Sequence, residues 1–253
     1  MSSPKGQVVA LLKSLETGDS RALDALSTDT YIQHNLAVGD GRAGLAGLFA
    51  SLPKGQVRVN TVRVFQDGDF VFAHTDYDFF GPKIGFDIFR FDHGKVVEHW
   101  DNLQTKATAP SPGGHTMIDG PTTARDLDKT AANKALMQTY MDDLLQGRRE
   151  RFTSYFEGGR YLQHSPLVGD DLAGLFAGLQ ALAKEGKDVK YTRVHRILGE
   201  GDFVLVVAEG TFGAAPSAYY DLYRIDNGKI AEHWDTIEAI PPRAEWKNAN
   251  GKF

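Results

Sequence analysis

The chain has 253 residues, of which 42% are hydrophobic and 24% charged, as expected of a soluble globular protein. Its net charge of −5 and the lack of any Lys/Arg cluster with interleaved aromatic residues argue against a nucleic-acid or membrane surface. The chain has no cysteine, which excludes disulfides, thiolate zinc sites and a cysteine nucleophile. Without a long apolar run or a signal-like start, we expect a cytoplasmic location.

The sequence contains two copies of one pattern. YIQHNLAVGDGRAGL at 31–45 aligns with YLQHSPLVGDDLAGL at 161–175, and FDIFRFDHGKVVEHWD at 86–101 aligns with YDLYRIDNGKIAEHWD at 220–235. A period of about 130 residues is too long for a solenoid unit and indicates a duplicated domain. We assign the first copy to residues 1–106, a Pro- and Gly-rich linker to 107–127, and the second copy to 128–253.

Each copy begins with helical signals and ends with strand signals. In the first copy, Ser3 is placed to cap a helix whose Val8, Leu11 and Leu15 share one face, and Gly18 is placed to end it. A short helix near Leu23 and a third helix at AGLAGLFASL follow. The rest reads as strands: VRVNTVRVF, FVFAHTDYDFF, GFDIFRF and VVEHWDNLQ. This order predicts an α+β fold with helices on one face of a curved sheet, leaving a conical hollow suited to a small molecule.

Three motifs carry a resemblance to a known family. YIQHN, DIFRFDHGKVVEHWD and GHTMIDGPT resemble the SnoaL-like polyketide cyclase family of the nuclear transport factor 2-like superfamily. The resemblance implies tandem cone-shaped α+β barrels, each with three N-terminal helices packed on a curved, mostly antiparallel sheet. It also implies ring closure by intramolecular aldol condensation without a metal or organic cofactor. An aspartate on the last strand is the family's general base, and by position it matches Asp101 and Asp235.

Side-chain alternation gives a separate indication for the EHWD motif. Along the last predicted strand, His99 and Asp101 share one face, and Trp100 lies on the other. The second copy repeats this order with His233 and Asp235. We therefore expect the histidine and aspartate to face the cone and the tryptophan to pack on the outer side of the sheet.

Whether Asp87 joins His99 depends on the hairpin turn. A two-residue loop of His93-Gly94 places Asp87 beside Trp100, whereas a three-residue loop ending at Gly94 places Asp87 opposite His99. Asn227-Gly228 in the second copy favours the two-residue type. The family's inward pair of polar residues favours the other type, and we predict the three-residue loop.

Proton abstraction beside a carbonyl needs a base near the substrate and a donor for the developing enolate oxygen. Desolvation in an apolar cone raises the pKa of a carboxylate and makes it a better base. The predicted catalytic residues are Asp101, His99, His34, Asp235, His233 and His164. The predicted substrate-binding residues are Gln33, Asn35, Asp87, Phe89, Gln163, Ser165, Asp221 and Tyr223.

Other interpretations stay open. His99 and Asp101 could be a hydrogen-bonded pair that ends a strand. With His34 they could form a two-histidine, one-carboxylate metal site, but the family resemblance implies none, and we expect neither a metal nor a cofactor. Because fold does not settle function, a non-catalytic small-molecule binding protein is the alternative to an enzyme. No GxSxG motif or phosphate-binding loop supports other chemistry.

The expected ligand is a small apolar compound that contains a carbonyl group, with no nucleic-acid or membrane partner. Single-domain relatives often dimerise through the outer sheet face, so we expect the two copies to form an intramolecular pseudo-dimer, with further homo-oligomerisation open. The second cavity should be more polar than the first, because its tyrosines carry hydroxyl groups. Each of these hydroxyls needs a hydrogen-bond partner when it is buried. The second copy has Ser165, Tyr220 and Tyr223 where the first has Asn35, Phe86 and Phe89.

Overall fold

The computed structural model describes residues 2–53 and 55–253. The chain divides into two compact units. The first unit comprises the described residues up to Thr105 together with Pro241–Phe253, and the second comprises Lys106–Ile240. The linker therefore belongs to the second unit by its contacts, and the C-terminal tail, residues 241–253, belongs to the first. Within the described residues, no helix is both long and apolar enough to cross a membrane.

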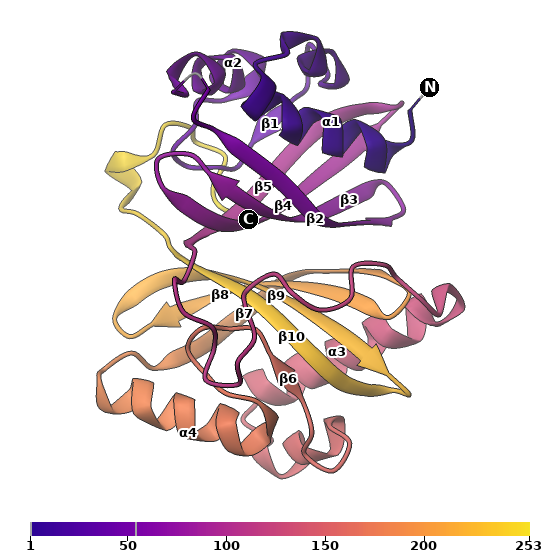
Figure 1. Cartoon of the computed structure of the whole chain (residues 1–253), viewed down its shortest axis with the longest axis vertical. Coiled ribbons are helices and arrows are strands. Elements are labelled where there is room, and N and C mark those ends of the chain that lie inside the picture. Colours follow the sequence, from indigo (N-terminus) through magenta and orange to yellow (C-terminus); the bar gives the residue numbers. More distant parts are fainter. Residues whose placement is uncertain (1, 54) are drawn as a thin grey trace. The chain divides into compact units, whose positions relative to one another are not determined.

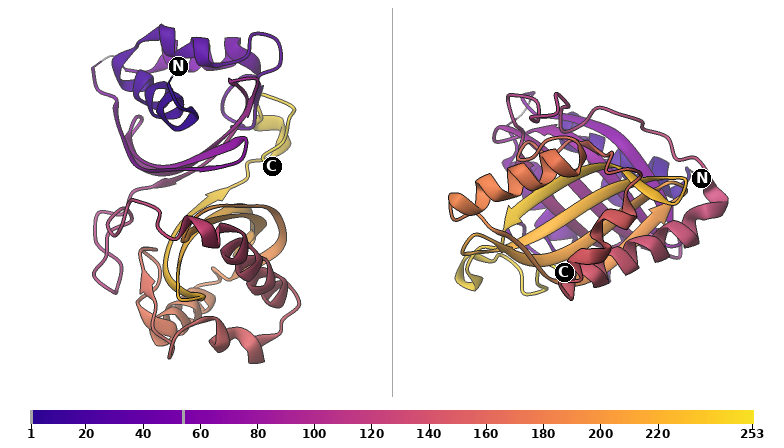
Figure 2. Two further views of the ribbon diagram at one scale, coloured as in Figure 1. Left: turned by 90° about the vertical axis from the view of Figure 1, so that its right-hand side faces the viewer. Right: turned by 90° about the horizontal axis from the view of Figure 1, so that it is seen from below.

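The first unit has helices on one face of a five-stranded sheet (Figure 1). The sheet order is β1-β5-β4-β3-β2, with β1 parallel to β5 and the other pairs antiparallel. Figure 2 shows the strong curvature of this sheet around α1. Its elements are α1 (Pro4–Thr17), η1 (Ser20–Ala25), β1 (Ile32–Gln33), α2 (Gly41–Ser51), β2 (Arg58–Asp67), β3 (Phe70–Asp78), β4 (Pro82–Asp92) and β5 (Lys95–Thr105), with the short η4 (Arg243–Glu245) in the tail.

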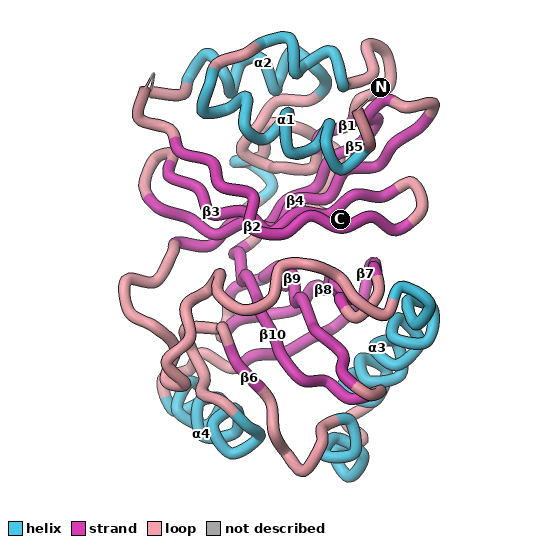
Figure 3. The backbone as a smooth tube through the Cα atoms, turned by 45° about the vertical axis from the view of Figure 1, so that its right-hand side comes forward, coloured by secondary structure: helices cyan, strands magenta, loops and turns pink. Residues whose placement is uncertain are grey.

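The second unit repeats this architecture with sheet order β6-β10-β9-β8-β7 (Figure 3). Again the short first strand pairs in parallel with the last one. Its elements are η2 (Leu127–Lys129), α3 (Thr130–Leu145), η3 (Arg149–Tyr155), β6 (Leu162–Gln163), α4 (Asp171–Lys184), β7 (Val189–Glu200), β8 (Phe203–Phe212), β9 (Ala215–Asp226) and β10 (Lys229–Ala239). The predicted α+β class and tandem cone-like domains are confirmed.

Local chemistry explains the first helix. The Ser3 hydroxyl accepts a hydrogen bond from the Gly6 amide at 3.2 Å and caps α1. Gly18 ends the helix with a φ of 70°, a conformation that glycine adopts at low cost. Val8 and Leu11 are buried against the sheet, so the apolar stripe in the sequence becomes the helix–sheet core.

A close backbone approach explains one glycine in the first turn of α2 and one in the first turn of α4. A Cβ atom on Gly44 would overlap the carbonyl oxygen of Gly39, and one on Gly174 would overlap the Gly169 backbone. The loop that follows β1 or β6 therefore packs directly against the first turn of α2 or α4. Glycine at both places is required by this contact.

The hairpin of β4 and β5 has a two-residue loop, so the prediction of a three-residue loop is wrong. Asp92 pairs with Lys95, so the loop contains only His93 and Gly94, with φ values of 47° and 76°. Positive φ at both positions is typical of a two-residue turn whose twist suits the flanking strands. Asn227 and Gly228 repeat this geometry in the second unit.

A β-bulge follows each of these turns and changes the register. In the first unit the pairing shifts between Arg90 and Phe91, and Asp87 then lies opposite Asp101. In the second unit a shift between Ile230 and Glu232 places Asp221 opposite Asp235. The extra residue of each bulge returns the aspartates to one face, which the turn type alone would not have done.

The face of each sheet that packs against the helices is called the inner face below. In the first unit it carries Val71, Tyr77 and Phe89, and in the second Val204 and Tyr223, all in the helix-covered cores. Strand alternation places Trp100 and Trp234 on the opposite, outer face, as predicted.

The same alternation corrects one expectation about the cavities. Phe86 and Tyr220 are adjacent to the inward Asp87 and Asp221, so they lie on the outer face. Phe86 stacks on His74, with ring centroids 4.3 Å apart. The Phe-to-Tyr difference at these positions therefore adds no hydroxyl to the second cavity, whereas the difference between Phe89 and Tyr223 does.

Candidate active site

A histidine–aspartate pair lies on the inner face of the first unit. His99 Nε2 is 3.2 Å from Asp87 Oδ1, and His99 Nδ1 is 2.9 Å from Gln33 Oε1. The imidazole stacks on Phe89, with ring centroids 4.5 Å apart. Strands β1, β4 and β5 thus each contribute one polar side chain to a buried cluster.

The second unit repeats this pair closely. His233 Nε2 is 3.0 Å from Asp221 Oδ1, and His233 Nδ1 is 3.0 Å from Gln163 Oε1. The ring stacks on Tyr223 at a centroid distance of 4.6 Å. The predicted residues at these positions are therefore brought together in both units.

Hydrogen bonding defines the protonation of the imidazole. Gln163 Oε1 also accepts the Ser165 backbone N–H at 2.8 Å, so this atom is an acceptor and His233 Nδ1 carries a hydrogen. His233 Nε2 then faces the Asp221 carboxylate across one shared proton. In the first unit, Gln33 Oε1 likewise accepts the Asn35 backbone N–H at 2.9 Å, so His99 Nδ1 carries a hydrogen.

Tyrosines, which the sequence did not assign to the site, complete the aspartate contacts. Tyr77 donates its hydroxyl hydrogen to Asp87 Oδ2 at 2.6 Å. Tyr191 in the second unit is 3.2 Å from both oxygens of Asp221. Burial raises the pKa of Asp87, against the opposing effect of its hydrogen bond to His99. No local sequence motif identifies these tyrosines. They lie on other strands than the aspartates and come close to them only when the sheet forms.

The aspartates of the two EHWD motifs have different partners. Asp101 Oδ2 accepts a hydrogen bond from Asn35 Nδ2 at 2.5 Å, and Lys252 Nζ lies 3.7 Å from Asp101 Oδ1. The side chains of Lys252 and Asp101 are only 5% and 6% exposed. Lys252 belongs to the C-terminal tail, and nothing in its sequence neighbourhood predicted this contact.

Asp235 makes no ion pair with any of the described residues. Its Oδ1 is buried without a hydrogen-bond partner among them, and Ser165 hydrogen-bonds to the carboxylate. Burial raises the pKa of Asp235 to about 6, helped by the nearby Asp221 charge and opposed by His233. The second unit thus holds a carboxyl group that titrates near neutral pH.

A cavity of about 800 Å³ opens beside this cluster in the second unit. Its wall is mainly apolar and aromatic, and its polar residues are His233, several tyrosines, Gln180 and the charged Asp143, Arg148, Arg149 and Lys190. The lining includes Tyr140, Leu144, Phe152, Tyr161, Phe176, Tyr191, Tyr223 and His233. Asp235 and Asp221 lie on the same face of the sheet as His233 but do not line the cavity.

His34 and His164, which were predicted to be catalytic, do not join the cluster. His34 stacks on the outer-face Trp100 at 4.8 Å and contacts Glu98 Oε1 at 3.0 Å. His164 stacks on Trp234 at 4.5 Å. The chain turns at the end of β1 and β6, so these histidines point away from the inner face while Gln33 and Gln163 point into it.

The metal set of His34, His99 and Asp101 is therefore not assembled. Ligand-capable atoms do lie within 4.8 Å of one another in the groups Asp87, His99, Asp101 and Asp221, His233, Asp235. Each group has a single histidine, which shares a proton with one of the two aspartates. These groups suit proton sharing better than metal coordination.

Residues 8–99 match the SnoaL-like domain family, whereas none of the curated proteins matches the chain. Among solved structures, IdmH of Streptomyces antibioticus, a candidate polyketide cyclase, aligns at 18% identity over 41% of this chain and 93% of its own, with a TM-score of 0.35. A candidate ketosteroid isomerase from Kribbella flavida aligns at 18% identity over 45% and 84%, with a TM-score of 0.35. A protein of Catenulispora acidiphila with a ketosteroid isomerase-like fold, in complex with trimethylamine, aligns at 19% identity over 40% and 85%, with a TM-score of 0.33.

Proposed function

Residues 8–99 form a SnoaL-like domain whose fold the second unit repeats, and on this premise we propose that the chain catalyses cofactor-independent acid–base chemistry on a small carbonyl compound. The reaction would be an aldol-type cyclisation or an isomerisation. The observation that carries the proposal is the buried Asp235, whose pKa is raised to about 6, on the same sheet face as His233, which lines a mainly apolar cavity of about 800 Å³. We assign the activity to the second unit for this reason.

Asp235 acts as the general base in this proposal. A carboxylate with a pKa near 6 is ionised at neutral pH and is a stronger base than an ordinary aspartate. Beside Asp235, His233 and Asp221 share one proton. This sharing lowers the free energy needed to move charge during the reaction. The corresponding first-unit residues are Asp101, His99 and Asp87.

Tyr161 is the donor to the enolate oxygen. Its hydroxyl oxygen accepts a hydrogen bond from Gln163 Nε2 at 2.9 Å, so its own hydrogen is available to a ligand. Tyr161 lines the cavity, and burial raises its pKa well above the ordinary value, which keeps it protonated. Such a fixed neutral donor stabilises developing negative charge without reorganisation.

Non-catalytic binding of a small apolar ligand is the alternative function. One observation favours it: Asp235 itself does not line the cavity. A ligand in the cavity would then contact His233 and the tyrosines, and the aspartates would serve to hold the histidine.

Solvent deuterium exchange tests the proposal. The full chain is incubated in D₂O with a panel of cyclic ketones, and exchange at the carbon beside the carbonyl is followed by NMR. Asp235→Asn should lower the exchange rate about 100- to 10,000-fold, the usual contribution of a general base, while ketone binding persists. Asp188→Asn, the same change at an exposed residue of the second unit, is the control. Ketone binding without exchange in the unmodified protein would support the binding alternative, and equal rates in Asp235→Asn would refute the assigned base.

The remaining expectations about partners and location stay predictions. They are a small apolar carbonyl ligand, a cytoplasmic location and a sheet-to-sheet pseudo-dimer of the two copies. Chemical cross-linking of lysines followed by mass spectrometry tests the pseudo-dimer, since outer-face residues of the two sheets should then be linked.

A further inference from the structure

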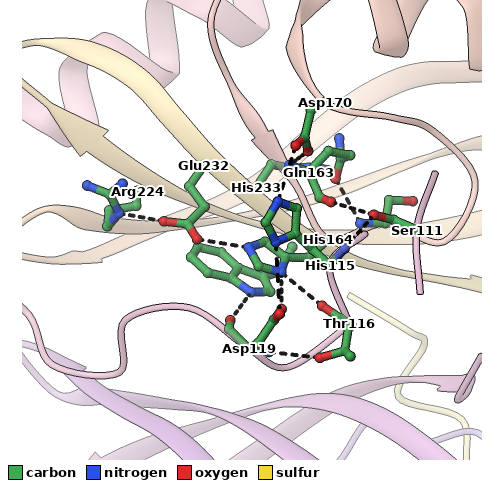
Figure 4. A network of polar contacts seen from close by, with 12 residues as sticks. Ser111, His115, Thr116, Asp119, Gln163, His164, Asp170, Arg224, Glu232 and His233 are labelled. Atoms are coloured by element: carbon green, nitrogen blue, oxygen red, sulfur yellow. Dashed lines mark hydrogen bonds and ion pairs between the residues drawn. The ribbon is translucent and has the colours of Figure 1, made fainter. Parts of the chain in front are cut away.

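The linker segment 111–119 is hydrogen-bonded to the rest of the second unit, and none of its residues lines the cavity. Ser111 donates its hydroxyl hydrogen to the Gln163 carbonyl at 3.0 Å, and Trp234 Nε1 donates to the Asp119 carbonyl at 3.0 Å. Figure 4 shows that this segment brings His115 and Asp119 next to His164. The GHTMIDG motif contains both linker residues, and the proposed chemistry does not use it.

We propose that His115, Asp119 and His164 bind one divalent transition-metal ion. His164 Nδ1 is 2.6 Å from Asp119 Oδ1, and His115 Nδ1 is 3.9 Å from Asp119 Oδ2. All three residues offer ligand atoms within 4.8 Å of one another. Small side-chain rotations would let the two nitrogens and one carboxylate oxygen share an ion at about 2.0–2.2 Å.

The second ring nitrogen of each histidine is held by another carboxylate. His164 Nε2 is 2.8 Å from Glu232 Oε1, and Glu232 is buried and paired with Arg224 Nε at 2.7 Å. His115 Nε2 is 3.2 Å from Asp170 Oδ2. Metal-binding histidines typically donate their other N–H to a carboxylate, which fixes the tautomer and orients the ring. Both histidines here have that support, and both direct Nδ1 to the same carboxylate.

The oxygens around His164 Nδ1 also favour a cation. This nitrogen is 2.8 Å from the Thr116 carbonyl in addition to its contact with Asp119. A ring nitrogen this close to two oxygens must either carry a hydrogen that they accept or share a metal ion with them. The ion would replace that hydrogen and gain the Thr116 carbonyl as a further oxygen ligand.

Access and ligand type indicate the class of ion. The side chains of His115 and Asp119 are 29% and 45% exposed, so an ion can enter from solvent, while His164 is buried. Two imidazoles and one carboxylate favour zinc, copper or nickel over magnesium or calcium. None of these three ligands lines the cavity, so the ion would secure the linker on the second unit and is independent of the proposed catalysis.

The first unit provides a natural comparison because its tail lies in a similar way but lacks the ligands. Gly251 accepts from His34 Nδ1 at 2.9 Å, as Thr116 does from His164. The preceding residue, Asn250, contacts Asp40 Oδ1 at 2.8 Å, as His115 contacts Asp170. An amide thus replaces the second imidazole, and we expect no metal site there.

Isothermal titration of Zn²⁺ into the untagged, chelator-treated full chain tests the proposal. One equivalent should bind, and Co²⁺ should give visible absorption bands of an imidazole–carboxylate site. His115→Asn, which introduces the first unit's residue, and Asp119→Asn should each weaken binding more than about tenfold, because even loss of a supporting residue costs 10- to 100-fold. His93→Asn, the same change at an exposed turn histidine, is the matched control and should bind normally.

A second measurement separates metal binding from folding. Hydrogen exchange of the linker amides should slow on adding Zn²⁺ in the unmodified protein and not in His115→Asn, whose metal-free exchange pattern elsewhere should be unchanged. No saturable binding at millimolar Zn²⁺, or equal affinity in the unmodified protein and both ligand variants, would overturn the proposal.

Discussion

The two copies carry the same EHWD strand but hold its aspartate in different surroundings. Asp101 is paired with the buried Lys252, whereas Asp235 has no cation partner among the described residues and has a pKa raised to about 6. Lys252 follows Gly251, whose carbonyl contacts His34, and Met117 follows Thr116, whose carbonyl contacts His164. Methionine thus stands at the place in the linker that lysine holds in the tail. The difference shows that a segment remote in sequence, not the strand motif, decides whether a cation lies beside the aspartate.

This comparison supports a division of roles. In the first unit, the buried Lys252 places a positive charge beside Asp101. In the second unit, Asp235 has no such cation among the described residues, and burial raises its pKa to about 6. A duplicated domain can in this way keep one copy as a stable module and specialise the other.

The largest effect on stability is expected from Lys252→Met, which gives the tail the linker's residue. Asp101 would remain buried without its cation, and breaking a buried pair from one side costs about 3–5 kcal/mol. Because the 3.7 Å separation is long for a hydrogen bond, we expect about 3 kcal/mol, measured at pH 7 by native-state hydrogen exchange of β5 amides.

Two further variants sharpen this test. Lys247→Met, the same change at an exposed tail residue, should leave β5 exchange unchanged. Adding Asp101→Asn to Lys252→Met removes the unpaired charge and should restore most of the lost stability. Unchanged β5 exchange in Lys252→Met alone would show that the ion pair contributes nothing.

The next effect concerns pH and Asp235. The pKa of Asp235 in the folded protein, about 6, lies above the ordinary value of 3.8. Between these two pH values, the folded protein keeps a proton that the unfolded chain loses. The stability contributed by this group is complete below pH ~4 and is lost as the pH rises through ~6. With about 1.4 kcal/mol for each pKa unit, the loss is about 2–3 kcal/mol.

Asp235→Asn should lack this decline, so its stability relative to the unmodified protein should rise between pH ~4 and ~6. Hydrogen exchange of β10 amides across this range measures it, with Asp188→Asn as the control. A constant difference between Asp235→Asn and the unmodified protein over the range would argue against a raised pKa.

The smallest effect compares the tyrosines that contact the paired aspartates. Tyr77 is 2.6 Å from Asp87, whereas Tyr191 is 3.2 Å from each oxygen of Asp221. A hydrogen bond to a charged group contributes about 1.5–3 kcal/mol, so Tyr77→Phe should cost about 2 kcal/mol and Tyr191→Phe about 1 kcal/mol or less. Chemical denaturation followed separately in β4 and β9 checks this order, and a larger loss from Tyr191→Phe would contradict it.

Local sequence was sufficient for much of the fold. The caps and apolar spacing around Ser3, Val8 and Gly18 predicted the first helix, and the repeat predicted a second domain with the same order of elements. Alternation along EHWD correctly separated His99 and Asp101 from Trp100. These features depend on residues that are neighbours in the chain, so their pattern is visible without the structure.

Long-range contacts decided the rest. The bulge that brings Asp87 opposite Asp101 depends on how a whole hairpin packs, and the turn residues, which favour a two-residue loop, do not predict it. The outward direction of His34, the tyrosines at the aspartates, Lys252 at Asp101 and the approach of His115 to His164 likewise come from separate segments. Sequence spacing determined which face each strand residue occupies, because the backbone fixes that geometry locally. Tertiary structure determined which charges meet, because side chains far apart in the chain are brought together only when the core forms.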